Sequence, residues 1–277
     1  MTVEDDDARR SLDQAGLAWQ TGVWDRISLT YLREVDKRFA PVIDNVIARA
    51  ELAPGQHVLD LGTGTGAAAV RAVSAVALEG TVTGVDISSE MLTLARQRAT
   101  QLGLENVSFE EGRAEEIPAS EASFDSVLAS LVMMYVIDRE AAAREIARVL
   151  RRGGRFVAAV WAGPEQCDIV LFQQTAGRFA PSPPVLGVGP GALADPSPFL
   201  QQLGDAGIDA TVQRKTLGFH FGSFDLAWDV LAGVTTAQLD ADRRNEAKAA
   251  VQQLMWPRDE GPRHFRNVTQ FIIGEKT

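Results

Sequence analysis

Short apolar runs alternate with segments of helical periodicity through the middle of the chain. Apolar runs typical of buried strands occur at 58–61, 81–86, 107–110, 124–129 and 155–161. Apolar residues at helical spacing fill 66–78, 89–102 and 139–151. This alternation predicts a parallel sheet with helices on both faces, which is an α/β fold.

The two ends of the chain follow other patterns. Residues 12–38 repeat apolar side chains at helical spacing, and we expect 1–40 to form an N-terminal helical cap segment. Residues 162–196 are rich in proline and glycine, and we expect a long ordered loop there. Beyond this loop the pattern predicts a helix at 197–206, a strand at 210–221, a helical stretch at 223–256 and a strand at 265–273.

The stretch from Val58 to Gly66 indicates a buried strand that runs into a glycine turn and then a helix. Backbone N–H groups at a helix N-terminus point outward, and glycines let a ligand approach the main chain. The next strand ends in Asp86, and an acidic residue at that distance can accept two hydrogen bonds from a ribose diol. The pattern therefore predicts a nucleoside-binding turn.

Asp60 argues against a dinucleotide in this turn. Gly62-x-Gly64-x-x-Ala67 fits the dinucleotide fingerprint, so a nicotinamide-dependent oxidoreductase on a Rossmann fold stays open as an alternative. However, Asp60 lies two residues before the first glycine, where its charge would repel a pyrophosphate, and Gly66 comes early for that fingerprint. The acid instead favours a cationic ligand.

Five motifs follow one another in a family-specific order. They lie at 58–66, 84–96, 112–118, 124–127 and 145–156. Their order and spacing resemble those of class I S-adenosylmethionine (SAM)-dependent methyltransferases, in particular the small-molecule enzymes of the ubiquinone/menaquinone-biosynthesis type. The resemblance covers roughly residues 40–162. It implies SAM as the cofactor, whose sulfonium and ammonium groups suit Asp60.

The resemblance also implies the rest of the architecture. Residues 41–277 would form a Rossmann-like, doubly wound domain with a seven-stranded sheet, mostly parallel with an antiparallel last strand. A helical insertion at about 222–263 would then lie at the carboxyl ends of the parallel strands, where open α/β sheets bind ligands. A site covered by this insertion and by the N-terminal helices suits a small, partly apolar methyl acceptor. Whether an O-, C- or N-atom accepts the methyl group stays open.

The family's cofactor contacts carry over to matching positions. Gly62, Gly64 and Gly66 would let the methionine part and the ribose pass close to the main chain, and Asp60 would lie near the ammonium group. The other implied contacts are Asp86 with the ribose, Ile87 and Met91 with the adenine ring, Ala114 or Glu115 with the adenine edge, and Ser130 near the methyl group. Arg113 departs from the family, which often has an acid there, because arginine cannot accept a hydrogen bond.

Three residues are candidates for catalysis. His220 ends the sixth predicted strand and His264 begins the seventh, so both are expected at the ligand edge, where a general base near neutral pH is most simply a histidine. Tyr135 follows the fourth strand, whose end borders the transferable methyl group in this fold. Since none of the three is an obvious base, a non-catalytic SAM-binding protein remains a second alternative.

Composition and charge narrow the class of partner. The 277 residues carry a formal net charge of −10, which argues against a nucleic-acid binder. No apolar run is long enough to span a bilayer, and an acidic N-terminus is unlike a secretory signal. One cysteine, Cys167, excludes an internal disulfide, so the expected location is the cytoplasm. No acidic cluster specifies a metal.

Overall fold

A seven-stranded sheet forms the centre of the computed structural model, which describes residues 3–258 and 261–277. The strands are β1 (His57–Leu61), β2 (Thr81–Asp86), β3 (Val107–Glu111), β4 (Phe124–Ser130), β5 (Leu150–Trp161), β6 (Ile208–Phe221) and β7 (Arg263–Lys276). Their order across the sheet is β3-β2-β1-β4-β5-β7-β6. The pairs from β3 to β5 are parallel, and β7 runs antiparallel to both β5 and β6. This confirms the predicted Rossmann-like fold.

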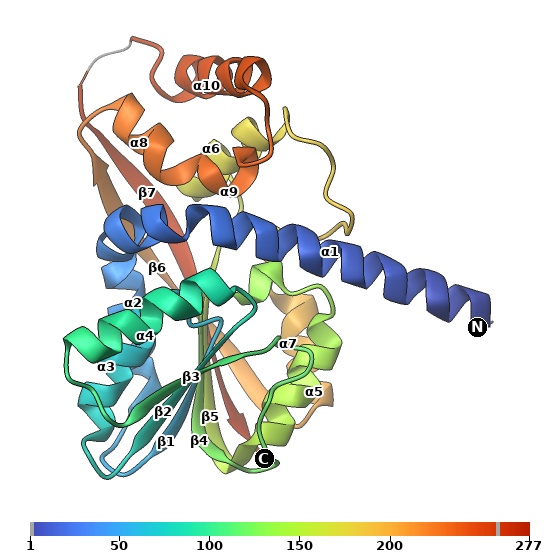
Figure 1. The fold of residues 1–277 in the computed structure, drawn as a ribbon, viewed down its shortest axis with the longest axis vertical. Helices are drawn as coiled ribbons and strands as arrows, with labels where there is room; N and C mark the ends of the chain where they lie inside the picture. The colour runs from blue at the N-terminus through green and yellow to red at the C-terminus, as the bar shows by residue number, and fades with distance from the viewer. Residues whose placement is uncertain (1–2, 259–260) are drawn as a thin grey trace.

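Helices cover both faces of the sheet. The helices α2 (Asp36–Ala50), α3 (Ala67–Val76) and α4 (Ser89–Gln101) lie on one face, and α5 (Arg139–Val149) and α7 (Ser197–Asp205) lie on the other (Figure 1). The central strands are therefore buried on both sides, as Leu59, Val127 and Val157 show with 0% exposure. Burial on both faces explains why these strands are continuous apolar runs in the sequence rather than alternating ones.

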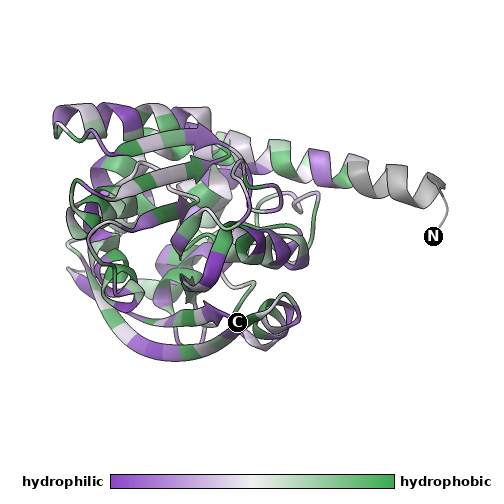
Figure 2. Cartoon of the chain, turned by 90° about the horizontal axis from the view of Figure 1, so that it is seen from below, coloured by the Kyte–Doolittle hydropathy of each residue, from purple (hydrophilic) through white to green (hydrophobic). Residues whose placement is uncertain are grey.

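The remaining helices gather at one end of the sheet. They are α1 (Val3–Thr30), the π-helical turn η1 (Tyr31–Val35), α6 (Asp168–Gly177), α8 (Phe224–Leu231), α9 (Gly233–Thr236) and α10 (Ala241–Met255). Figure 1 shows α1 running between the sheet domain and the helices α8 to α10, and α1 contacts both α4 and α9. Seen from below, α1 again reaches past the sheet domain (Figure 2). No helix among the described residues is long and apolar enough to cross a membrane.

The predicted loop at 162–196 is wrong in its first half, because α6 occupies Asp168–Gly177. Apart from Pro164, which precedes α6, the prolines of this segment begin only at Pro181. The N-terminus of α6 is capped from a distant strand, since the Ile169 amide donates a 2.9 Å hydrogen bond to Asn267 Oδ1 in β7. A helix whose cap lies about a hundred residues away carries no local start signal.

Candidate active site

A cavity opens at the carboxyl ends of β1, β2 and β4, and we call it the cofactor cavity. Most of the residues predicted from the sequence line it, namely Gly62, Gly64, Asp86, Ile87, Met91, Ala114, Glu115, Ser130 and Tyr135. They come from three of the sequence motifs and from the end of β4 and the segment after it, and the parallel sheet brings them together because the carboxyl ends of its strands meet at one edge.

The glycine turn forms one wall of the cofactor cavity. Gly62 (φ +65°) and Gly64 (φ +55°) both have left-handed backbone conformations that favour glycine. A Cβ atom on Gly62 would overlap Val132 in the segment after β4, whereas one on Gly64 would meet no protein atom within 4 Å. Gly62 is therefore required by packing, and Gly64 faces open space inside the cavity.

Asp86 is fixed at the end of β2 by main-chain donors. Its Oδ2 accepts a 2.8 Å hydrogen bond from the Gly64 amide, and its Oδ1 accepts a 2.9 Å bond from the Ser88 amide. Burial raises the pKa of this carboxyl to about 6, and the amide bonds act in the opposite direction. The glycine turn and the acidic residue thus form one rigid unit on the wall of the cavity.

Asp60 and Gly66 do not line the cofactor cavity. Asp60 is 1% exposed, and its Oδ2 accepts a 2.7 Å hydrogen bond from Thr63 Oγ1. Burial raises its pKa to about 7, with hydrogen bonds from Thr63 and the Ala69 amide opposing the rise. Gly66 precedes α3 and packs near Ala95, not against open space. The structure thus places both residues beneath the turn, and the expectation that Asp60 lies beside the ammonium group finds no support in this geometry.

A buried polar network that sequence reasoning missed holds the turn from behind. Asp36, at the start of α2, is 8% exposed, and its Oδ2 accepts 2.6 Å hydrogen bonds from Thr65 Oγ1 and from Arg98 Nη2 in α4. The Arg98 guanidinium also donates to the Thr65 carbonyl at 3.0 Å. Two helices distant in sequence therefore meet on the glycine turn and fix its shape.

Helix α1 closes the cofactor cavity, where we expected the N-terminal helices to cover the site. Leu17, Gln20 and Trp24 of α1 and Tyr31 of η1 line the cavity. Their spacing of three, four and seven residues places them on one stripe of a helix, which is a signal that the sequence contains. Gln20 Nε2 donates a 2.8 Å hydrogen bond to the Tyr135 carbonyl and so ties α1 to the segment after β4.

Two further cavities adjoin the cofactor cavity. The aromatic cavity, of about 380 Å³, lies under α8 and α9 and is walled by residues that include Tyr31, Phe39, Leu131 and Trp161. The proline cavity, of about 330 Å³, lies under the loop that contains Pro181, Pro183 and Pro190. All three cavities share Trp24 and Tyr135, and the cofactor and aromatic cavities also share Tyr31 and Leu131. Space of this size suits a small molecule, since such sites measure roughly 300–1,000 Å³.

Leu131 stands at the junction between the cofactor and aromatic cavities. It follows β4 directly and has a left-handed backbone (φ +62°), which is uncommon for a residue with a branched side chain. Its amide donates a 2.8 Å hydrogen bond to the Ala159 carbonyl of β5, so the neighbouring strand holds this conformation in place. Strained backbone of this kind, which costs about 1–3 kcal/mol, is concentrated at functional sites.

Comparison with known proteins agrees with this geometry. Residues 52–176 match a family model described as a methyltransferase domain. The ubiquinone/menaquinone biosynthesis C-methyltransferase UbiE of Xanthomonas campestris pv. campestris is 41% identical over 110 residues, which are 39% of this chain and 44% of that protein. The chain carries a class I SAM-dependent methyltransferase domain.

Two further relatives extend the match. The 27-O-demethylrifamycin SV methyltransferase of Amycolatopsis mediterranei is 35% identical over 62% of this chain and 59% of its own. The crystal structure of YcgJ from Bacillus subtilis superposes with a TM-score of 0.64 and 25% identity, covering 86% of this chain and 98% of the other. The chain aligns with about half the length of the curated relatives it matches. These relatives favour SAM as the cofactor and count against a nicotinamide-dependent oxidoreductase.

The methyltransferase domain does not place its two histidine candidates at the cofactor. His220 and His264 are paired across β6 and β7, both are exposed, and their rings lie 4.6 Å apart. Neither lines any of the three cavities. Both lie away from the cavities because β7 continues past β5: the pairing of β7 with β5 ends at Thr269, and His264 lies five residues beyond, about 16 Å along the strand.

Tyr135 follows β4 and lines all three cavities. Burial raises its pKa well above the ordinary value, and burial does the same to Tyr31. The ring of Tyr135 packs edge-to-face on Trp24, with ring centroids 4.9 Å apart. A phenol whose pKa is raised is a poor general base at neutral pH, so Tyr135 is better suited to shaping the passage between cofactor and acceptor.

The segment after β3 forms the far wall of the cofactor cavity. Glu115 Oε1 accepts hydrogen bonds from the amides of Ile137 (3.1 Å) and Asp138 (3.2 Å), which ties this segment to the one after β4. Arg113 forms an ion pair with Glu116 at 3.3 Å on the surface. Glu115 is thus engaged in holding two loops together, and a contact between the Ala114 main chain and adenine stays our prediction.

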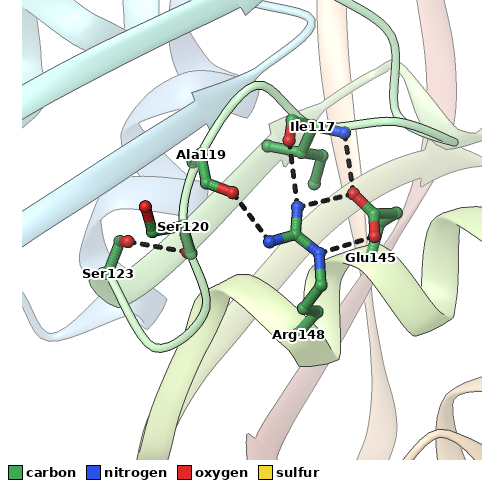
Figure 3. A network of polar contacts seen from close by, with 6 residues as sticks. All are labelled: Ile117, Ala119, Ser120, Ser123, Glu145 and Arg148. Carbon is green, nitrogen blue, oxygen red and sulfur yellow. Dashed lines mark hydrogen bonds and ion pairs between the residues drawn. The ribbon is translucent and has the colours of Figure 1, made fainter.

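Arg148 clamps the same segment from α5 (Figure 3). Its guanidinium pairs with both oxygens of Glu145 at 2.7 Å and donates to the carbonyls of Ala119 (2.7 Å) and Ile117 (3.0 Å). Glu145 in turn accepts from the Ile117 amide at 2.9 Å. The sequence analysis did not foresee this clamp, because its carbonyl partners lie about thirty residues from Arg148.

We expect Arg148→Met to lower the free energy of unfolding by about 1–2 kcal/mol, since the lost bonds involve a charged group that is 34% exposed. Affinity for S-adenosylhomocysteine (SAH) should also fall, by up to about tenfold, because the wall that carries Ala114 and Glu115 loosens. Arg144→Met is the control, because Arg144 pairs with exposed Glu140 on the same helix. Thermal unfolding and calorimetry that give the same values for both variants would contradict the clamp.

The raised pKa of Asp86 predicts a pH dependence of cofactor binding. A ribose diol donates hydrogen bonds to the ionised carboxylate, so SAH affinity should fall about tenfold per pH unit below about pH 6. The folded chain without ligand holds this proton more tightly than the unfolded chain, so the group's contribution to stability falls as pH rises from about 4 to 6. Calorimetry from pH 5 to 8 measures the affinity. Asp86→Asn should remove most of the dependence, and an unchanged slope in that variant would assign it to Asp60 instead.

Proposed function

We propose that this chain transfers the sulfonium methyl group of SAM to a small, partly apolar molecule and releases SAH. One observation carries the proposal: the cofactor cavity adjoins two further cavities, and all three are lined by Trp24 and Tyr135. A cofactor held by the glycine turn and Asp86 could direct its methyl group past these two side chains. The acceptor would lie in the aromatic or the proline cavity.

The cover over these cavities supports an enclosed reaction. Residues 1–40 act as the N-terminal cap, and the insertion at 222–263, which contains α8, α9 and α10, acts as a lid in this proposal. The helix α6 joins them. Sulfonium is already a strong electrophile, so the chain contributes chiefly by aligning the acceptor and excluding water. This explains how the reaction proceeds although neither histidine lines the cavities.

The relatives narrow the choice of acceptors for a first test. One relative is named for 27-O-demethylrifamycin SV and another, from Streptomyces, for aklanonic acid. Both compounds therefore belong in the first panel of acceptors. The acceptor atom is left open between oxygen, carbon and nitrogen.

Methyl transfer is tested with SAM carrying a labelled methyl group. The chain is incubated with this SAM and a panel of small apolar molecules that includes 27-O-demethylrifamycin SV and aklanonic acid, and products are separated by mass spectrometry. We expect SAH release together with one labelled methyl group on at least one panel member. Tight SAH binding without transfer to any panel member would favour the non-catalytic SAM-binding alternative.

A further inference from the structure

One buried side chain in the wall of the apolar cavities is not fully paired. Gln173 lies on α6, is 4% exposed, and lines both the aromatic and the proline cavity. Its Oε1 has no hydrogen-bond partner among the residues that the structure describes. The charged side chains on the wall of the aromatic cavity, Arg26, Asp229 and Arg244, are exposed instead. Gln173 is thus a buried polar group in a wall that also carries aromatic side chains.

The orientation of the amide identifies the unpaired atom. Gln173 Nε2 donates a 3.4 Å hydrogen bond to the carbonyl of Leu231 at the end of α8. Exchanging the two amide atoms would set oxygen against oxygen, so Nε2 stays on the Leu231 side and Oε1 is the free acceptor. A buried amide oxygen without a donor costs about 1–3 kcal/mol, and a leucine here would avoid that cost.

The surroundings of Gln173 indicate what could supply the missing donor. The aromatic cavity is walled by Trp24, Tyr31, Phe39, Tyr135 and Trp161. Trp24 meets Tyr135 at an interplanar angle of 89°, and Phe39 meets Trp161 at 69° with centroids 5.5 Å apart. Rings packed edge-to-face leave flat faces for another ring, since aromatic pairs prefer offset or edge-to-face contacts.

We propose that the methyl acceptor is a hydroxylated aromatic molecule and that Gln173 is the residue that selects its hydroxyl group. The ring of the acceptor packs among the aromatic side chains, and its O–H donates to Gln173 Oε1. This inference rests on the proposed function, because it names the acceptor class for the same site. Gln173 positions the acceptor and takes no part in the chemical step.

The probes are 1-naphthol and 1-methylnaphthalene, which have the same ring and differ in whether they can donate a hydrogen bond. Equilibrium dialysis measures the binding of each to the full chain at saturating SAH. We expect 1-naphthol to bind at least tenfold more tightly, which corresponds to about 1.4 kcal/mol. In Gln173→Leu this preference should disappear, and 1-methylnaphthalene should bind at least as well as before.

The control variant is Gln201→Leu, the same substitution at an exposed position of α7 that lines none of the three cavities. It should keep the full preference for 1-naphthol. Gln173→Leu should unfold at the same temperature as the unaltered chain or higher, because it loses only the long bond to Leu231. If that variant does not fold, the preference of the unaltered chain and the behaviour of Gln173→Met decide the question.

Equal affinity for the two probes, binding of neither, or a preference that persists in Gln173→Leu would overturn the inference. SAH affinity, measured on the same samples, separates this failure from that of the proposed function. Normal SAH binding without the preference removes the hydroxyl assignment alone. A preference for 1-naphthol without any SAH binding would leave Gln173 as a hydroxyl-selecting residue and remove the methyltransferase proposal.

Discussion

Gly64→Val should abolish measurable SAM and SAH binding and leave the chain folded. A Cβ atom added at Gly64 meets no protein atom within 4 Å, so a valine side chain would project into the cofactor cavity and occupy the ligand's space. The left-handed backbone there (φ +55°) adds strain for a β-branched residue. Calorimetry with SAH measures the affinity, and thermal unfolding measures the stability.

Gly103→Val provides a matched control for that strain. Gly103 follows α4 with a φ of +64°, and an added Cβ there also meets no atom within 4 Å, but Gly103 does not line the cofactor cavity. Both variants should lose similar stability, and only Gly64→Val should lose the ligand. If Gly64→Val bound SAH within threefold of the unaltered chain, the glycine turn would not contact the cofactor.

Asp86→Ala should weaken SAH binding by about a hundredfold or more at pH 7.5. The substitution removes two hydrogen bonds from ribose hydroxyls to a carboxylate, each of which contributes about 1.5–3 kcal/mol. It also frees the Gly64 and Ser88 amides that Asp86 now accepts from, which loosens the turn. Asp86→Asn keeps the shape and one acceptor oxygen, so its loss should be intermediate. Titration calorimetry that shows less than a threefold change for Asp86→Ala would remove Asp86 from the ribose site.

The parallel core could be predicted because its physics is local. Strands β1 and β4 are buried along most of their length, so each is a short, mostly apolar run that stands out from the helices beside it. The helix α6 could not be predicted in the same way. Its cap is Asn267 in β7, and that contact exists only after the sheet has formed.

The residues of the site also differ in whether the local sequence or tertiary packing determines their positions. Gly62, Gly64, Asp86 and Ile87 follow their strands directly, so predicting the strands also placed these residues at the sheet edge. Trp24 reaches the cavity only because α1 packs across that edge, where Ser88 Oγ donates a 2.6 Å hydrogen bond to Asp25 and anchors the helix on α4. The helical spacing of Leu17, Gln20 and Trp24 indicates a buried stripe, but no residue nearby in the sequence indicates which element that stripe faces.

The positions of His220 and His264 depend on where β6 ends. The end of the sixth strand lies at the ligand edge only if β6 stops level with the other strands. Instead β6 and β7 continue together as a two-stranded ribbon toward α8 and α10 (Figure 1), and His220 and His264 lie on this extension. The lengths of β6 and β7 depend on the helices packed at the far end of these two strands. The alternation of residues in β6 does not indicate where β5 ends.

A structure of the chain with SAH bound tests the central claim most directly. We expect the ribose hydroxyls of SAH to lie within hydrogen-bonding distance of Asp86 and the adenine to lie between Met91 and the Ala114 segment. The sulfur should lie beside Leu131 and Tyr135 and face the aromatic cavity. SAH bound outside the cofactor cavity, or bound with its sulfur directed away from Tyr135, would contradict the proposed methyl-transfer site.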